Sequence, residues 1–183
     1  MPTTARGHQR RGSGAHGYRR YRLPFRRKAA HVTQHVFAGW APGLTFEMVS
    51  TQTSDALFAY TWSRGDTTFI HQHAVDAFAA QNADDETPPI KLAFALIGLY
   101  LLIERRRTGR EIQRVHGQLA QRKDSWPRFA IPTDRGGFTV ADVMMADEGP
   151  ERDKAIHAWC QSVWAAFIGS RRAIEELLQR HGV

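Results

Sequence analysis

The chain has 183 residues, of which 42% are hydrophobic and 23% are charged; this composition fits one globular domain and excludes a largely disordered chain. Because Cys160 is the only cysteine, an internal disulfide is excluded and stability does not depend on an oxidising compartment. The formal net charge of +7 comes from residues 1–40, which hold nine basic residues and no acid, whereas residues 41–183 hold 16 bases and 18 acids.

Residues 1–47 form a basic tail that we expect to be disordered or dispensable for folding. Up to Leu23 it is dominated by glycine, arginine, histidine and serine, which cannot bury enough apolar surface to offset the entropy of ordering. Between Gly17 and Lys28 arginines alternate with aromatic residues, a pattern that can neutralise phosphates and stack on bases. The tail is therefore the segment predicted to contact nucleic acid. The competing interpretation is a tail without function, in a protein whose translation starts at Met48.

Residues 48–183 are predicted to form one all-α domain, a single helical bundle of about five or six helices. No window alternates apolar and polar residues in the manner of a β-strand. The first helix is predicted to be capped by Ser54 and to end near Gly65, and the second to follow directly and run to about Asn82. Because the charge of this domain is close to neutral, it makes no electrostatic case for binding nucleic acid.

The third predicted helix begins at Pro88 and Pro89 and is apolar on nearly every side from Leu92 to Ile103. This pattern places it at the centre of the bundle, and Gly98 in its middle predicts close approach of another helix. Twelve apolar residues are well short of the roughly 20 that a membrane span needs. Since no signal-peptide pattern is present either, we expect a cytoplasmic protein without a membrane partner.

The second half of the domain carries further helix signals. A capping box at Thr108 begins the fourth helix. Residues 124–138 contain two prolines and two glycines and are predicted to be an extended crossover. A short helix follows Thr139, a long helix with a buried aromatic stripe starts at Pro150, and an amphipathic segment beyond Gly169 closes the bundle.

The second helix holds the best candidate for a functional site. It carries His71, His73 and Asp76 within an otherwise apolar pattern, and Phe69, His73 and Ala77 are spaced four apart, as on a core-facing helix. An imidazole that points into a helical core needs a hydrogen-bond partner or a metal, because burying it unpaired costs a few kcal/mol. We therefore expect His73 to be paired or to bind a metal.

Ligands for a divalent metal can be drawn from three helices. His73, His116 and His157, or Asp76 in place of one of them, could hold a zinc, iron or nickel ion. Such an ion would lower the pKa of its bound water toward about 7 and supply a nucleophile. The sequence contains no HExxH, no ExxH and no paired CxxC motif. In the competing interpretation, His73 and His157 are core histidines bonded to polar neighbours.

Two further features bear on chemistry. Cys160, which stands three residues after His157, can be its partner in metal binding, but its apolar surroundings predict an inert thiol. The other feature is a run of arginines at the end of the third predicted helix, where the helix dipole is negative; these residues also form a candidate anion site: Arg105, Arg106, Arg107 and Arg110.

Several separated segments, among them Phe69–Gln81 and Ala95–Leu99, resemble a bacterial family of uncharacterised helical proteins. The resemblance spans about residues 55–180. It implies a helical domain and no established activity. Many members of that family carry histidines where this chain has Asn82 and Ala95, so a metal site that uses those positions would be lost here.

The sequence favours a non-catalytic binding or interaction domain and assigns no catalytic residues. Its partners are not specified, and oligomerisation is left open. Two alternatives remain, a metal-dependent helical-bundle enzyme with ligands from His73, His157 and His116 or Asp76, and a protein that contacts nucleic acid through its tail.

Overall fold

The computed structural model divides the chain into two units, Met1–Pro42 and Gly43–Val183, and describes residues 46–122 and 126–183, all of them in the second unit. The expectations for the basic tail therefore lie outside the described residues, apart from its last two positions, which begin helix α2. The described part of the chain contains α-helices and no strand, so the prediction of an all-α bundle is confirmed.

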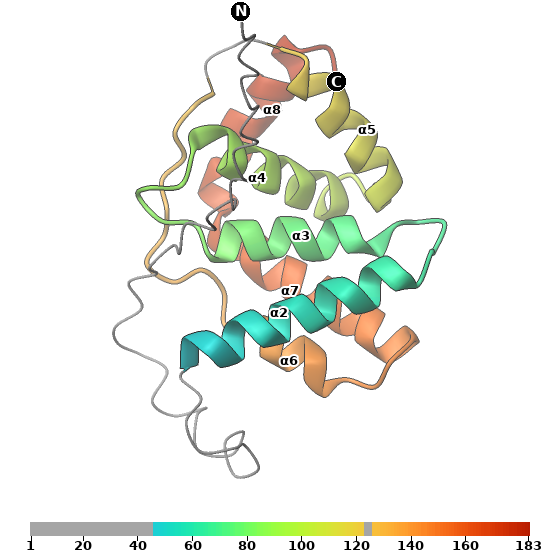
Figure 1. Cartoon of the computed structure of the whole chain (residues 1–183). Helices are drawn as coiled ribbons and strands as arrows, with labels where there is room; N and C mark the ends of the chain where they lie inside the picture. Colours follow the sequence, from blue (N-terminus) through green and yellow to red (C-terminus); the bar gives the residue numbers. More distant parts are fainter. Residues whose placement is uncertain (1–45, 123–125) are drawn as a thin grey trace, which may run out of the picture. The chain divides into compact units, whose positions relative to one another are not determined.

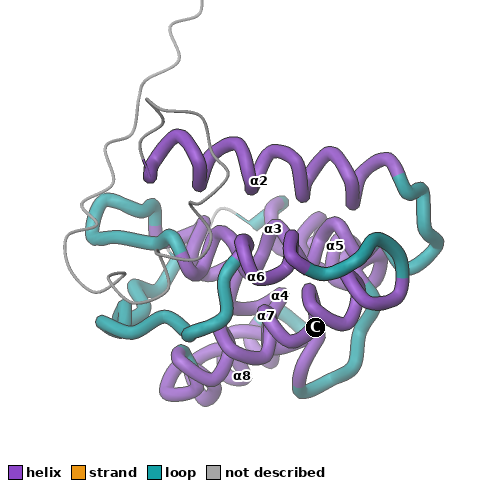
Figure 2. Tube along the Cα trace, turned by 90° about the horizontal axis from the view of Figure 1, so that it is seen from below, coloured by secondary structure: helices purple, strands orange, loops and turns teal. Residues whose placement is uncertain are grey.

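The described residues form seven α-helices and one short 3₁₀ helix, which are joined by loops (Figure 1). In chain order they are α2 (Phe46–Ser63), α3 (Ile70–Gln81), α4 (Pro89–Ile103), α5 (Gly109–Ala120), α6 (Val140–Met145), α7 (Pro150–Ala166), η2 (Ile168–Ser170) and α8 (Arg171–Arg180). Helix α3 packs against α2, α4, α5 and α7, and α4 packs against α5, α7 and α8. Figure 2 shows α2 and α8 on opposite sides of the bundle.

Local signals set most of the helix starts. The predicted capping box of α5 is present, since Thr108 Oγ1 accepts from the backbone N–H of Glu111 at 3.3 Å and Glu111 Oε2 accepts from that of Thr108 at 2.8 Å. Thr139 begins α6 with the same type of motif. Prolines occupy the first turns of α4 and α7, where the missing N–H has no intrahelical role.

The predicted cap at Ser54 is wrong. Helix α2 begins at Phe46, and Ser54 lies inside it as a buried residue. No glycine or proline interrupts the segment from Phe46 to Ser63, so the helix continues upstream of the serine.

Among the described residues, no helix is both long enough and apolar enough to cross a membrane.

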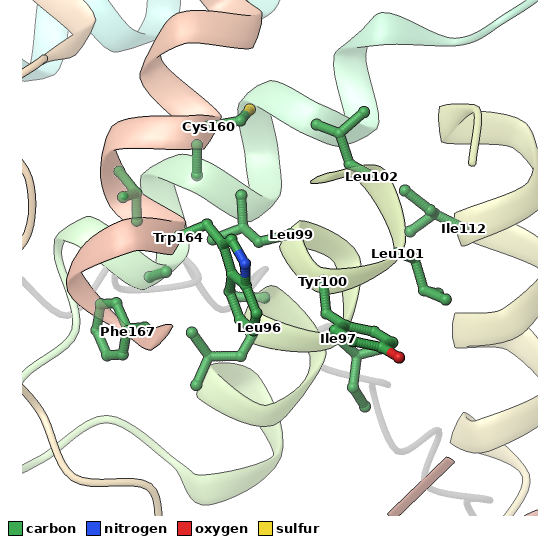
Figure 3. Packing of buried hydrophobic residues seen from close by; sticks show 14 of the residues in the cluster. Leu96, Ile97, Leu99, Tyr100, Leu101, Leu102, Ile112, Cys160, Trp164 and Phe167 are labelled. Carbon is green, nitrogen blue, oxygen red and sulfur yellow. The ribbon is translucent and has the colours of Figure 1, made fainter. Parts of the chain in front are cut away.

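Helix α4 lies in the centre of the bundle, as predicted. Figure 3 shows its side chains, among them Leu96 and Tyr100, between Trp164 and Phe167 on one side and Ile112 of α5 on the other. All five of these side chains are almost completely buried. Burying such side chains is worth roughly 1.5–3 kcal/mol each, so α4 organises the other helices around it.

Close approach of α3 to α4 at Gly98 is confirmed. A Cβ atom at this position would overlap with Oδ2 of Asp76 on α3. Any larger residue at position 98 would therefore push apart the two helices that hold the candidate site.

The crossover that follows the gap in the described residues is held by Gln81, the last residue of α3. Its Nε2 donates to the backbone carbonyls of Phe138 at 2.8 Å and Gly136 at 3.2 Å. Its Oε1 accepts from Nε1 of Trp159 on α7 at 2.8 Å. A single side chain thus ties α3, the crossover and α7 together.

Candidate functional site

The predicted site residues occupy two environments. His73 and Asp76 lie one turn apart on α3 and are both buried, and His116 on α5 is half-buried. His157 on α7 is exposed, so its interpretation as a core histidine is wrong. The buried stripe of α7 includes Ile156, Cys160 and Trp164, and at about 100° per residue His157 lies at the edge of this stripe, on the first turns of the helix.

Asp76 is an unusual core residue because it is ionisable and completely enclosed. Its Oδ1 accepts from Nε2 of Gln72 at 3.0 Å, whereas its Oδ2 lies against Gly98 and has no hydrogen-bond partner among the described residues. Burial raises the pKa of this carboxyl well above its usual range, and the Gln72 hydrogen bond opposes the shift. Burial therefore favours the neutral acid at this position.

Gln72 links Asp76 to His116. The same Nε2 lies 3.5 Å from Nδ1 of His116, and the imidazole stacks on Phe94 of α4 with the ring centroids 5.0 Å apart. Burial lowers the pKa of His116 to about 4, and a hydrogen bond to the backbone of Phe94 opposes the shift. His116 is consequently a neutral imidazole near pH 7.

His73 is also held neutral. Burial, and next the neighbouring charge of His157, lower its pKa to about 4. Its Nδ1 is buried without a hydrogen-bond partner in the described part of the chain, and its backbone carbonyl accepts from Sγ of Cys160 at 3.5 Å. Burial raises the pKa of the Cys160 thiol, which keeps the proton on sulfur.

The structure thus brings His73, Asp76 and Cys160 together at the α3–α7 contact and connects His116 to Asp76 through Gln72. Over residues 46–122 and 126–183, no group of three or more His, Cys, Asp or Glu side chains is arranged to hold a metal ion. The metal ligands drawn from the sequence stay a prediction.

The lowered pKa values of His73 and His116 predict how the stability of the fold depends on pH. Each has a pKa near 6.5 when unfolded and about 4 when folded, so below pH 6.5 the unfolded chain binds protons that the folded chain does not. We expect the free energy of unfolding to fall as pH decreases from about 6.5 toward 4, by up to about 1.4 kcal/mol per pH unit for each histidine.

Urea denaturation at several pH values measures this slope. Because the raised pKa of Asp76 contributes stability at low pH that is lost as pH rises above 3.8, the comparison is best made in Asp76→Asn, which keeps the acceptor for Gln72. In that background, His73→Gln should reduce the slope and leave the contributions of His116 and His71, whose pKa values are also lowered. A stability that does not change between pH 7 and 5 would contradict the prediction.

A second cluster of functional groups lies on the surface. The indole of Trp62, at the end of α2, is 66% exposed. Its ring makes T-shaped contacts with Phe69, at a centroid distance of 5.9 Å, and with His71, at 5.2 Å. Phe69 precedes α3 and has a left-handed backbone with φ of 60°. The two contacts hold the indole in one orientation while most of its surface faces solvent.

His71 is fixed behind Trp62. Its Nδ1 lies 2.8 Å from Oγ1 of Thr61, and the Thr61 hydroxyl donates its proton to the backbone carbonyl of Leu57 at 2.9 Å. Nδ1 of His71 is therefore the donor in the contact with Thr61. Burial lowers the pKa of His71, which favours the neutral ring.

The start of α5 completes this surface. The Arg110 guanidinium lies over the Phe69 ring, 4.4 Å from its centroid, and the Arg110 backbone N–H donates to the carbonyl of Thr68 at 3.0 Å. Arg114 follows one turn later on the same outward side, and both arginines are exposed. We call Trp62, Phe69, His71, Arg110 and Arg114 the arginine–aromatic face.

The charge of this region is locally positive. Residues 104–114 contain five arginines and two glutamates. Arg107 pairs with Glu111, and Arg105 donates to the Tyr100 hydroxyl, whereas Arg110 and Arg114 form no ion pair with any described residue. Of the candidate anion site, Arg105 and Arg107 are therefore engaged by neighbouring side chains, and the arginines without an ion pair to a described residue continue along α5.

Sequence reasoning missed the aromatic half of this face. Phe69 was expected to point inward with His73, but it precedes α3 and its left-handed backbone takes it out of the helical repeat. The exposure of Trp62 could have been predicted from the sequence. The residue is followed by Ser63, Arg64 and Gly65, which end the helix at the protein surface.

Comparison with known proteins gives a family and no activity. A family of unknown function, DUF5946, matches residues 51–168, which is more than half of the chain, so the chain belongs to this family. The matched region includes the end of α2 with Trp62 and helices α3 to α7, and so every residue of both clusters, and it ends before α8. No curated protein and no solved structure matches the chain.

Proposed function

We propose that this member of the DUF5946 family is a non-catalytic binding domain that takes an anionic partner on its arginine–aromatic face. The observation that carries the proposal is the placement of Arg110 and Arg114. They are exposed on one side of α5, form no ion pair with a described residue, and adjoin the exposed Trp62 through Phe69.

The energetics of α5 support this proposal. Like charges four residues apart on a helix destabilise it by about 0.2–0.5 kcal/mol, and the only neighbouring carboxylate on the helix, Glu111, is already engaged by Arg107 and Thr108. An anionic partner would turn this repulsion into attraction. Arginine and tryptophan are also the residues most enriched where binding energy concentrates.

Two charge-removing changes test the proposal. In the full-length chain, Arg110→Gln together with Arg114→Gln should weaken binding of inorganic polyphosphate roughly tenfold at low salt, since each exposed charge pair is worth up to about 1 kcal/mol. Isothermal titration calorimetry measures the change. The basic tail is the same in every variant, so a difference in affinity between the variants reports on the two arginines.

Arg172→Gln is the matched control. Arg172 is an exposed arginine on α8, a helix that supplies no residue of the arginine–aromatic face, and its Nε donates to Glu176 at 2.9 Å. It should leave polyphosphate binding unchanged. If the double variant binds like this control, the arginine–aromatic face is not the binding surface.

A metal-dependent activity is the second candidate. It is favoured by Nδ1 of His73 and Oδ2 of Asp76, which are buried one turn apart on α3 without a hydrogen-bond partner among the described residues. His116 and His157 are the further ligands that the sequence suggests. Elemental analysis of the purified chain and of His73→Ala decides this question, because a stoichiometric ion that disappears in the variant would favour the metal.

A further inference from the structure

We infer that the anionic partner is single-stranded nucleic acid, with a base stacked on Trp62 and its phosphates at Arg110 and Arg114. The inference rests on the proposed function and names the partner of the same face. It follows from the combination of an oriented, exposed aromatic ring with two arginines beside it that form no ion pair within residues 46–122 and 126–183.

Trp62 has the properties of a stacking platform. Its indole is 66% exposed, and the T-shaped contacts with Phe69 and His71 fix the ring without covering most of it. Stacking of one base on an aromatic side chain is worth about 1–3 kcal/mol, and every base has a flat face that can take part. The neutral ring of His71 adds a hydrogen-bonding group beside this platform.

The Arg110 guanidinium lies near enough to Trp62 for one strand to contact both groups. The Phe69 ring contacts the Trp62 ring at 5.9 Å between the two centroids. The Arg110 guanidinium lies over the same Phe69 ring, 4.4 Å from its centroid. The guanidinium and the indole are thus separated by no more than these two distances combined. Arg114, one helical turn further on, continues the positive charge along α5.

The acids next to the face contact groups other than Arg110 and Arg114. Asp66 accepts from Thr68 Oγ1 at 2.5 Å and from the backbone N–H of Ile70 at 3.3 Å. Arg64 is paired with Asp153. A hydrogen-bonded carboxylate keeps its charge, so Asp66 weakens the local field. Arg110 and Arg114 nevertheless form no ion pair with any described residue and stay available for phosphates.

Two other polyanions fit less well. In a duplex the bases are paired and stacked on each other, so none can lie on Trp62 without being extruded at a cost of a few kcal/mol. An acidic protein would match the arginines, but its carboxylates give no stacking partner for the indole. A single strand supplies both an accessible base and a phosphate chain.

The test uses the full-length chain and a fluorescently labelled oligouridylate of about 15 nucleotides, within the range that such binding surfaces cover. Fluorescence anisotropy should show that Trp62→Ala binds about 5- to 150-fold more weakly, the loss expected for one stacked base. Trp62→Phe should keep most of the affinity because it keeps a flat ring. Arg110→Gln and Arg114→Gln should each reduce the slope of log K against log salt by about 0.7.

The outcomes separate this inference from the proposed function. If Trp62→Ala and the unchanged chain bind the oligouridylate with equal affinity, the inference is wrong. The strand then binds elsewhere, as it would if the basic tail were the binding segment. If polyglutamate or a duplex of equal length binds as tightly as the single strand, the inference is again wrong. The polyphosphate experiment with the two arginine variants then still reports whether the face binds anions at all.

Because Trp62 is largely exposed, Trp62→Ala should fold normally. Its circular dichroism spectrum and its thermal unfolding should match those of the unchanged chain, which excludes loss of structure as the cause of weaker binding.

Discussion

Replacing Trp159 with alanine should lower the free energy of unfolding by about 3–5 kcal/mol, the range for truncating a buried aromatic side chain. Trp159 has no exposed surface, and its Nε1 donates to Oε1 of Gln81 at 2.8 Å. The variant would leave a cavity between α7 and α3 and deprive Gln81 of a partner. Since domains are stable by only about 5–15 kcal/mol, urea denaturation should show a large shift of the midpoint.

Trp62→Ala is the matched control in the same chain. It removes the same side chain from a position that is 66% exposed, and surface changes of this kind usually stay within about 0.5 kcal/mol. If the two variants lose similar stability, Trp159 does not occupy the core position described above.

Gly109→Ala is the second change with a large expected effect. A Cβ atom at Gly109 would overlap with the carbonyl oxygen of Phe69 and lie 2.8 Å from its carbonyl carbon. These are backbone atoms and cannot rotate away, so the loop before α3 or the start of α5 must move. We expect a loss of about 1–3 kcal/mol, together with weaker ligand binding, because Phe69 and Arg110 would be displaced from each other.

Gly117→Ala, eight residues later on the same helix, should have the opposite sign. A Cβ atom there meets no atom within 4 Å, and alanine is favoured over glycine inside a helix by up to about 1 kcal/mol. Urea denaturation of both variants checks the pair. A Gly109→Ala variant as stable as Gly117→Ala would mean that α5 does not pack closely on the loop at Phe69.

The arginine–aromatic face also shows that net charge is a poor guide to local charge. Residues 41–183 hold 16 bases and 18 acids, which argued against an anionic partner for the domain. On α5, however, the carboxylate of Glu111 is engaged by Arg107 and Thr108, and Arg110 and Arg114 lie together on one exposed side. A local arrangement, which an average over the chain conceals, decides the field that a partner meets.

By itself, the sequence determined the helical class, the position of α4 at the centre and the starts of α5 and α6. These features depend on signals within a few residues, such as the reciprocal hydrogen bonds of Thr108 and Glu111, or on the apolar character of one continuous segment. It also placed His73 in the core, where the structure has it.

The tertiary structure alone decided which distant groups meet. Oδ2 of Asp76 lies against Gly98, Gln81 bonds both Trp159 and the crossover, and Phe69 brings Trp62 next to Arg110. Each of these contacts joins different helices or the loops between them, and depends on how the helices are rotated and offset. Helical periodicity fixes the direction of a side chain only relative to its own axis, so it could not pair residues on separate helices or foresee the left-handed turn at Phe69.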